Sequence, residues 1–220
     1  MKILVSWSSG KDSAWTLHAL RRDGANVGGL LTSLNETAGR VSMHGVRDDV
    51  LRAQASAAGL PLITIPLPWP CSNEIYEERL CAAVSDAVAR GFTHVAFGDL
   101  FLEDVRKYRE DRLAGTGLTP IFPLWGLPTP QLARDMIAGG LRARLTCVDP
   151  RAMPRELVGA EFDQRLLDAL PASVDPCGER GEFHSCVTAG PMFSRALQVE
   201  AGEVVEREGF VFCDLTLVQT

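Results

Sequence analysis

Apolar residues along the first half of the chain follow two patterns, short continuous runs and longer stretches with helical spacing. The short runs predict buried strands at residues 3–5, 27–34, 62–67 and 93–97. The stretches between and after them end at Gly or Pro and predict helices at residues 11–22, 47–58, 73–90 and 103–113. Strands that alternate with helices build a parallel twisted sheet with helices on both faces, so the predicted fold class is α/β and Rossmann-like.

The alternation becomes less regular after Leu127. The later segments predict a short extended piece at 120–124, helices at 129–138 and 161–170, a strand at 143–148, and paired strands within 203–218 that turn near Gly209. The proline-rich stretch at 120–130 is the predicted boundary between two domains. We therefore expect an α/β domain over residues 1–126 and a smaller α+β domain over residues 127–220.

Composition narrows the class of protein. The chain has 220 residues, of which 46% are hydrophobic, enough for one large core or one core plus a smaller domain. It shows no signal-peptide pattern and no apolar run long enough for a membrane span, which indicates a cytoplasmic protein. A net charge of −6 disfavours broad binding to nucleic acid. Six scattered cysteines without a C-x-x-C pair indicate reduced, structural thiols.

Polar residues follow the first predicted strand, where ligands of parallel sheets bind. Residues 8–13 read SSGKDS and lead into a helix. Because Lys11 is followed by Asp12 rather than by Ser or Thr, this is not a Walker A loop. Its backbone N–H groups, hydroxyls, lysine and helix dipole still suit an anion, and an acid beside them could hold Mg²⁺ or orient a loop amide. The alternative is ordinary capping of a helix N-terminus.

A charged cluster follows the fourth predicted strand. Asp99 comes directly after Gly98 at the carboxyl end of that strand, which favours a contact with metal or substrate. Glu103, Arg106 and Arg109 follow at helical spacing and are expected on one helix face. The alternative for these three is a solvated face with ion pairs.

The third stretch, GERGEFHS at residues 178–185, combines two glycines with two acids and a histidine. Gly181 permits backbone conformations that other residues avoid. Glu179 and Glu182 could bind a cation or an amine or act as bases, and His184 could transfer protons near neutral pH. The alternative is a turn that enters a strand, because the residues that follow alternate in polarity.

Two of these motifs resemble known ones. Residues 8–13 resemble the S-G-G-x-D-S loop of the ATP pyrophosphatases, which fold as adenine nucleotide α-hydrolases (the HUP class), and differ from it at Ser9. Residues 178–185 resemble the G-E-x-G-E-[FY]-x-[ST] signature of the diphthine–ammonia ligase family. Further motifs of that family occur in order at residues 43–46, 73–77, 97–100, 123–125 and 190–193. The resemblance covers about residues 1–195.

The resemblance implies an ATP-dependent amide ligase. Family members in eukaryotes and archaea adenylate a carboxylate of diphthine, release pyrophosphate and transfer ammonia. Carried over to this sequence, the resemblance implies catalytic roles for Asp12, Asp99, Glu182 and His184, with Asp12 also holding Mg²⁺. It implies ATP contacts for Ser8, Ser9, Gly10, Lys11, Ser13, Leu31, Thr32 and Ser33. It implies substrate contacts for Gly98, Glu103, Arg106, Arg109, Glu179 and Gly181.

The expected partners are ATP, ammonia and a carboxylate-bearing substrate, either a small molecule or a modified protein side chain. Homodimer formation is left open, and no membrane partner is expected. Two alternatives to the ligase are considered. A tRNA-modifying relative of the same superfamily would use paired cysteines, which Cys177 and Cys186 match only loosely. A non-catalytic nucleotide sensor would carry a later Gly-rich loop, which Gly115-x-Gly117 does not match.

Overall fold

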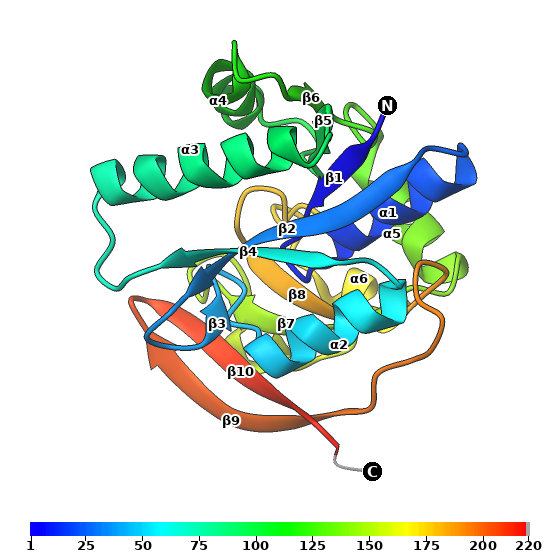
Figure 1. Ribbon diagram of the computed structural model, residues 1–220. Coiled ribbons are helices and arrows are strands. Elements are labelled where there is room, and N and C mark those ends of the chain that lie inside the picture. Colours follow the sequence, from blue (N-terminus) through cyan, green and yellow to red (C-terminus); the bar gives the residue numbers. More distant parts are fainter. Residues whose placement is uncertain (219–220) are drawn as a thin grey trace.

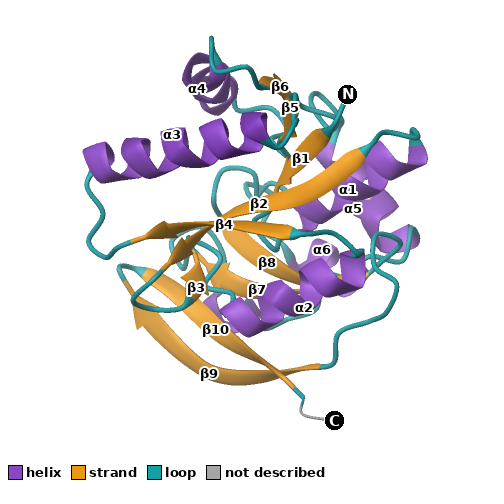
Figure 2. Cartoon of the chain, viewed as in Figure 1, coloured by secondary structure: helices purple, strands orange, loops and turns teal. Residues whose placement is uncertain are grey.

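Six strands from the first half of the chain form one sheet (Figures 1 and 2). The structure is a computed structural model that describes residues 1–218. The strands are β1 (Ile3–Ser6), β2 (Val27–Asn35), β3 (Arg40–Val41), β4 (Leu62–Leu67), β5 (His94–Ala96) and β6 (Thr119–Ile121). Their order is β3-β2-β1-β5-β6, with β4 also paired to β2, and only the β2–β3 pair is antiparallel.

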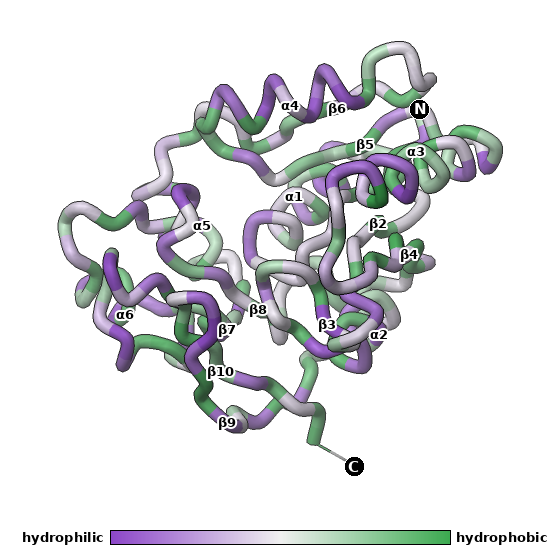
Figure 3. The backbone as a smooth tube through the Cα atoms, turned by 90° about the vertical axis from the view of Figure 1, so that its left-hand side faces the viewer, coloured by the Kyte–Doolittle hydropathy of each residue, from purple (hydrophilic) through white to green (hydrophobic). Residues whose placement is uncertain are grey.

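Four helices cover the two faces of this sheet: α1 (Lys11–Arg22), α2 (Asp48–Ala58), α3 (Asn73–Ala89) and α4 (Glu103–Leu113). Leu17 of α1 and Leu51 of α2 are fully buried in the larger core, which also contains residues of the C-terminal half. Val84 of α3 and Leu113 of α4 belong to a separate core on the opposite face. Complete burial of a leucine such as Leu17 contributes about 2 kcal/mol. In Figure 3, β4 is drawn largely hydrophobic, whereas α4 has long hydrophilic stretches.

The strand β2 extends beyond the carboxyl end of β1. Residues 27–31 of β2 pair with β1, and residues 30–35 pair with β4 on the other edge. Leu34 and Asn35 pair with β3. Since β4 already occupies one edge there, β3 takes the edge that β1 leaves free. The chain that follows β3 is thereby placed beyond the end of β1, beside the loop that leads into α1.

The second half forms a four-stranded antiparallel sheet in the order β8-β7-β10-β9. Its elements are α5 (Thr129–Ala138), β7 (Arg142–Val148), the 3₁₀ turn η1 (Arg155–Leu157), α6 (Gln164–Ala169), β8 (Phe183–Ala189), β9 (Val199–Arg207) and β10 (Phe210–Leu217). This sheet packs on the side of α1 and α2, and β8 and β10 contact these helices (Figure 1). The carboxylate-rich loop before β8 is thereby brought to the N-terminal sheet.

The predicted fold class, a mostly parallel α/β sheet followed by a smaller antiparallel unit, is confirmed. The helix α3 is capped by Ser72, whose hydroxyl accepts the N–H of Ile75. For residues 178–185, the alternative of a turn entering a strand describes the backbone correctly, since β8 begins at Phe183. Within residues 1–218, no helix is both long and apolar enough to cross a membrane. None of the six cysteines is bonded to another.

Candidate functional site

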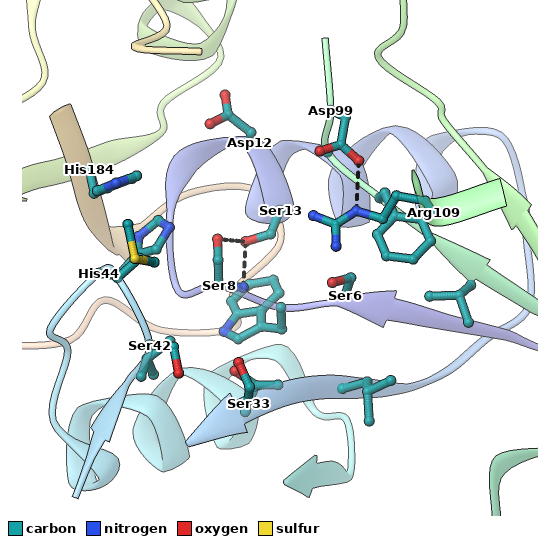
Figure 4. Close-up of a pocket in the computed structure, with 18 of the residues that line it drawn as sticks. Ser6, Ser8, Asp12, Ser13, Ser33, Ser42, His44, Asp99, Arg109 and His184 are labelled. Carbon is teal, nitrogen blue, oxygen red and sulfur yellow. Dashed lines mark hydrogen bonds and ion pairs between the residues drawn. The ribbon is translucent and has the colours of Figure 1, made fainter. Parts of the chain in front are cut away.

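A cavity of about 410 Å³ lies at the carboxyl ends of β1, β2 and β5. The residues that line it come from both halves of the chain (Figure 4). Residues predicted from the sequence that line it are Ser8, Lys11, Asp12, Ser13, Leu31, Thr32, Ser33, Gly98, Asp99, Arg109, Glu179, Gly181 and His184. The cavity therefore brings together the two polar stretches that follow strands, residues 31–33 of β2, and the signature loop.

The loop between β1 and α1 is held by its own hydroxyls and by α2. The Ser13 hydroxyl donates to the Gly10 carbonyl (3.0 Å) and lies 3.3 Å from the Ser8 hydroxyl (Figure 4). Gln54, fully buried on α2, donates to the Ser9 carbonyl (3.1 Å) and to a carbonyl of β8. The first-turn amides of α1 have no acceptor within the helix, and the helix dipole places partial positive charge there. The arrangement suits a phosphate group.

Ser9 adopts a left-handed backbone conformation with φ of +70°. A non-glycine residue there costs about 1–2 kcal/mol, which explains why glycine is common at this position in loops of this type. The Ser9 hydroxyl is buried without a hydrogen-bond partner and does not line the cavity. Serine therefore preserves the shape of the loop at a cost in stability.

Lys11 and Asp12 form a buried ion pair at the start of α1. The Lys11 ammonium donates to Asp12 Oδ2 (2.8 Å) and to the carbonyl of Cys177 in the second half of the chain. Burial raises the pKa of Asp12, although the positive charge of Lys11 acts to lower it. Burial opposes the charge of Lys11 as well, but Asp12, together with Cys177 and Glu179, outweighs it, and the net pKa of the lysine is raised. The ammonium thus joins the two halves of the site, and Asp12 Oδ1 is left buried without a partner.

Asp99 and Arg109 form the opposite wall. Arg109 Nε donates to Asp99 Oδ2 at 3.3 Å, and its guanidinium lies 4.7 Å from the centre of the Phe97 ring (Figure 4). Tyr108 and Arg112 of the same helix also line the cavity. On this wall, the positive charge of Arg109 is only partly neutralised by Asp99.

The signature loop contributes Glu179 to the cavity. Its Oε1 accepts the backbone N–H groups of Leu100 (2.7 Å) and Phe101 (3.4 Å), which docks the loop on the segment after β5. Burial, with the nearby charges of Asp12 and Asp99, raises the pKa of Glu179 to about 7, although the two N–H donors act in the opposite direction. Glu179 can therefore gain or lose a proton near neutral pH.

Glu182 does not line the cavity. Its Oε1 accepts the N–H of Asp175 (3.0 Å) and its Oε2 accepts the N–H of Arg180 (2.9 Å). The side chain is buried beneath the loop. Its position supports a role in holding the loop that carries Glu179, in place of the direct role in the chemistry that the sequence suggested.

We expect Glu182→Gln to lower the melting temperature while leaving affinity for ATP unchanged. The amide group can accept only one of the two N–H groups, and one unsatisfied buried donor costs about 1–3 kcal/mol. Differential scanning calorimetry and nucleotide titration would measure both quantities. Glu161→Gln, at an exposed carboxylate paired with Arg144, is the matched control. An unchanged melting temperature combined with lost amide formation would return Glu182 to a catalytic role.

Two imidazoles that line the cavity pack against each other in a tilted arrangement. The ring centres of His44 and His184 are 4.6 Å apart, and His44 Nδ1 lies 3.0 Å from the Ser185 carbonyl (Figure 4). Removal from water lowers the pKa of His44 to about 4, and the charge of Lys11 adds to this. Removal from water, with His44 and Lys11 nearby, lowers the pKa of His184 to about 3. Both rings are therefore neutral at physiological pH.

We expect the melting temperature to fall as the pH is lowered from 6.5 towards 4. In this window the histidines of the unfolded chain bind protons, because their pKa is about 6.5, and the two folded imidazoles do not. Glu179 has the opposite effect, since its raised pKa lets the folded protein hold a proton up to about pH 7. Thermal unfolding at a series of pH values should show that the melting temperature falls less per pH unit in His184→Asn than in the wild type, and more in Glu179→Gln. If the melting temperature of His184→Asn depended on pH as that of the wild type does, the lowered pKa of His184 would be contradicted.

The other predicted residues lie off the cavity. Gly10 is behind it, with the His44 ring packed so closely that a Cβ atom at Gly10 would lie 2.6 Å from His44 Cε1. Glu103 is exposed at the start of α4. The Arg106 guanidinium lies 4.8 Å from the centres of the Phe122 and Trp125 rings and pairs with Glu110. For Glu103 and Arg106, the solvated helix face describes the placement better than a substrate contact.

The sequence reasoning missed several residues of the site. His44, Gln54, Tyr76 and Arg112 received no role. The sequence did contain a signal for His44 and Tyr76, because both lie within motifs shared with the family that the chain resembles. Gln54 gave no signal, because a glutamine in an amphipathic helix is ordinary.

Both halves of the chain match domain models of one protein family. Residues 1–118 match the model of the diphthamide synthase N-terminal domain, and residues 129–217 match that of the diphthamide synthase C-terminal domain. A diphthine–ammonia ligase of Schizosaccharomyces pombe is 26% identical over 235 aligned residues, which span 98% of this chain but 39% of that protein. A solved structure of a predicted tRNA methyltransferase subunit from Methanocaldococcus jannaschii superposes with a TM-score of 0.46 at 16% identity, over 87% of this chain and 98% of that one. With both domain models matched in order, the chain belongs to the diphthamide synthase family.

Proposed function

We propose that this protein is an ATP-dependent ligase that adenylates a carboxylate and transfers ammonia to it. The observation that carries the proposal is the meeting of two distant motifs at one cavity. The Lys11 amide donates to the Ser185 hydroxyl (3.2 Å), and the Lys11 ammonium donates to the Cys177 carbonyl. A phosphate-binding loop is thus joined to a loop that presents a carboxylate and an imidazole.

The cavity has two parts that match the two parts of ATP. The polar part, around the start of α1, suits the phosphates. The other part is mainly apolar and lies between the sheet and the helices α3 and α4. Its residues include Leu31, Ile65, Tyr76, Leu80, Val84, Val95 and Leu113. We place the adenine there, beside Leu31, Thr32 and Ser33.

Asp12 is the residue best suited to a magnesium ion that accompanies ATP. Mg²⁺ usually takes one or two carboxylate oxygens and completes its shell with water and phosphate oxygens. Asp12 Oδ1 is buried without a partner at the phosphate loop, which fits this role. Within residues 1–218, no three acidic, histidine or cysteine side chains converge on one point, so such an ion would depend on the phosphates. The ion would neutralise charge that develops on the departing pyrophosphate.

The proposed reaction has two steps. A carboxylate oxygen of the substrate attacks the α-phosphorus, the α–β bond of ATP breaks, and pyrophosphate leaves with that electron pair. Ammonia then attacks the acyl carbon, AMP leaves, and the extra proton on nitrogen is lost. Because its pKa is raised to about 7, Glu179 suits the role of the base that accepts that proton, whereas His184, with a pKa lowered to about 3, is too weak a base for it. We assign Arg109, beside Asp99, to the binding of the substrate carboxylate.

Diphthine is not carried over as the acceptor. The chain spans 39% of the length of the curated relative it matches, so the activity of that longer protein need not be that of this chain. The proposal therefore specifies a carboxylate, on a small molecule or on a protein side chain, and ammonia as the nitrogen donor.

The proposal is tested by calorimetric titration with ATP and Mg²⁺, followed by a pyrophosphate-release assay with ammonium and a panel of carboxylates. We expect ATP binding, and pyrophosphate release that depends on one class of carboxylate. A tightly bound ATP that is never cleaved would support a nucleotide sensor. Failure to bind ATP at all would overturn the proposal.

A further inference from the structure

A short hairpin, residues 40–47, forms part of the rim of the cavity. The Val41 N–H donates to the Val46 carbonyl (2.8 Å), and a β-bridge joins Arg40 to Arg47 at the base. The tip residues Ser42, Met43 and His44 line the cavity. Met43 is 66% exposed and has a left-handed φ of +63°, so its own side chain does not hold the tip in place.

The base of this hairpin is fastened by one carboxylate of the C-terminal sheet. Asp214 of β10 accepts Arg40 Nη1 at 2.7 Å, and it accepts Arg47 Nε at 3.0 Å and Nη2 at 2.5 Å. The same Arg40 nitrogen donates to the Gly45 carbonyl within the hairpin (2.7 Å). Although burial opposes the charge of Asp214, the two arginines lower its pKa to about 2. The carboxylate is therefore ionised at any physiological pH.

The tip of the hairpin reaches the phosphate loop. His44 is held from the C-terminal half through the Ser185 carbonyl, and its ring covers Gly10 at van der Waals distance. Within the N-terminal sheet, the hairpin is tied to β2 by two paired residues and by a long hydrogen bond from the Ser42 N–H to the Ser33 carbonyl (3.4 Å). Without Asp214, the charges of Arg40 and Arg47 would lie unpaired beside each other at its base and repel.

We propose that Asp214 is a positioning residue, which holds the 40–47 hairpin so that His44 closes over the phosphate loop. This inference rests on the proposed binding of ATP at that loop. The C-terminal domain would then contribute to nucleotide binding from two sides, with Ser185 at the tip and Asp214 at the base of one hairpin.

The test is a double-mutant cycle on the Kd of a non-hydrolysable ATP analogue, measured by calorimetry. We expect Asp214→Asn and His44→Ala each to weaken binding by about tenfold, and the double variant to bind no more weakly than His44→Ala, because coupled residues are not additive. Asp214→Glu, which keeps the charge, should recover most of the affinity. Effects that simply multiply would show that Asp214 does not act through His44, and would overturn the inference.

Asp149→Asn is the matched control. Asp149 also pairs with an arginine, Arg151, and its side chain has the same 16% exposure as that of Asp214. It lies outside the cavity, so its loss should leave the Kd unchanged. An equal loss of affinity in Asp149→Asn would mean that removing any such carboxylate loosens the protein, and would overturn the specific role.

Hydrogen exchange of the hairpin amides tests the positioning role of Asp214 in the absence of nucleotide. In the free protein, the amides of Val41 and Gly45, which donate to the carbonyls of Val46 and Val41, should exchange at least about tenfold faster in Asp214→Asn, because local opening becomes easier. Unchanged exchange there would overturn the positioning role even if the variant bound ATP weakly. If the wild type bound no ATP analogue, the proposed function would fail, while the exchange rates would still report whether Asp214 holds the hairpin.

Discussion

Replacement of Asp12 by asparagine is expected to slow pyrophosphate release from ATP by about a hundred- to a thousandfold, the loss typical for one preorganised electrostatic contact. Asp12 follows the phosphate loop directly, and its Oδ1 is buried without a partner. An amide oxygen can still coordinate a cation, but it lacks the negative charge that would hold one beside a polyphosphate. The loss should therefore appear in turnover more than in the affinity for free ATP.

The asparagine variant separates this effect from unfolding. Its amide oxygen can still accept from the Lys11 ammonium, which also donates to the Cys177 carbonyl, so the lysine is not left without partners. Alanine at position 12 would leave the buried Lys11 ammonium without its carboxylate partner, which is strongly destabilising. Asp23→Asn, at an exposed ion pair beyond the other end of α1, is the control. Full turnover in Asp12→Asn with a wild-type melting temperature would remove Asp12 from the reaction.

Local signals predicted much of the fold. The bounds of α1, α4 and α5 agree with the expected helices. α1 and α5 each bury an apolar side, whereas α4 is mostly polar and has acids in its first turn and an arginine in its last. The parallel sheet followed from the alternation of strands and helices alone. The site was predicted as far as residues follow the ends of strands, since the topology brings those ends to one edge.

The hairpin at residues 40–47 could not be predicted in the same way. Its strand β3 has only two residues, and its place depends on β2 extending past β1. Arg40 and Arg47 read as surface charges in the sequence. Their shared partner Asp214 is 174 and 167 residues away, a separation that no local pattern reveals.

Glu179 and Glu182 show a second limit of local reasoning. Both belong to one short motif, and the residue types alone do not indicate which of the two carboxylates takes part in the reaction. The backbone decides between them, because Gly178 and Gly181 take left-handed φ values of +66° and +84°. The resulting turn sends Glu179 into the cavity and buries Glu182 beneath it.

Gly98→Ala is expected to impair both stability and activity, with the larger effect on activity. A Cβ atom at Gly98 would lie 2.9 Å from the backbone carbon of Asp12 and 3.0 Å from its carbonyl oxygen. Backbone atoms in the first turn of a helix cannot move aside as the end of a flexible side chain can. Overpacking of this kind costs about 1–3 kcal/mol. Relief would require β5 and α1 to separate, which would move Asp12 away from Lys11 and from the phosphates.

A displacement of about 1 Å in a reacting group can cost about a hundredfold in rate. Pyrophosphate release from Gly98→Ala should fall by at least that factor, while the melting temperature falls by about 2–4 °C for each kcal/mol lost. Gly202→Ala is the matched control, because a Cβ there would lie 3.5 Å from the Asp214 side chain, an ordinary contact. Wild-type stability and rate in Gly98→Ala would mean that the packing of β5 against α1 is loose, and that Asp12 is not held in place by Gly98. A variant that folds normally yet releases no pyrophosphate would instead show that the close approach of these two backbones serves the position of Asp12.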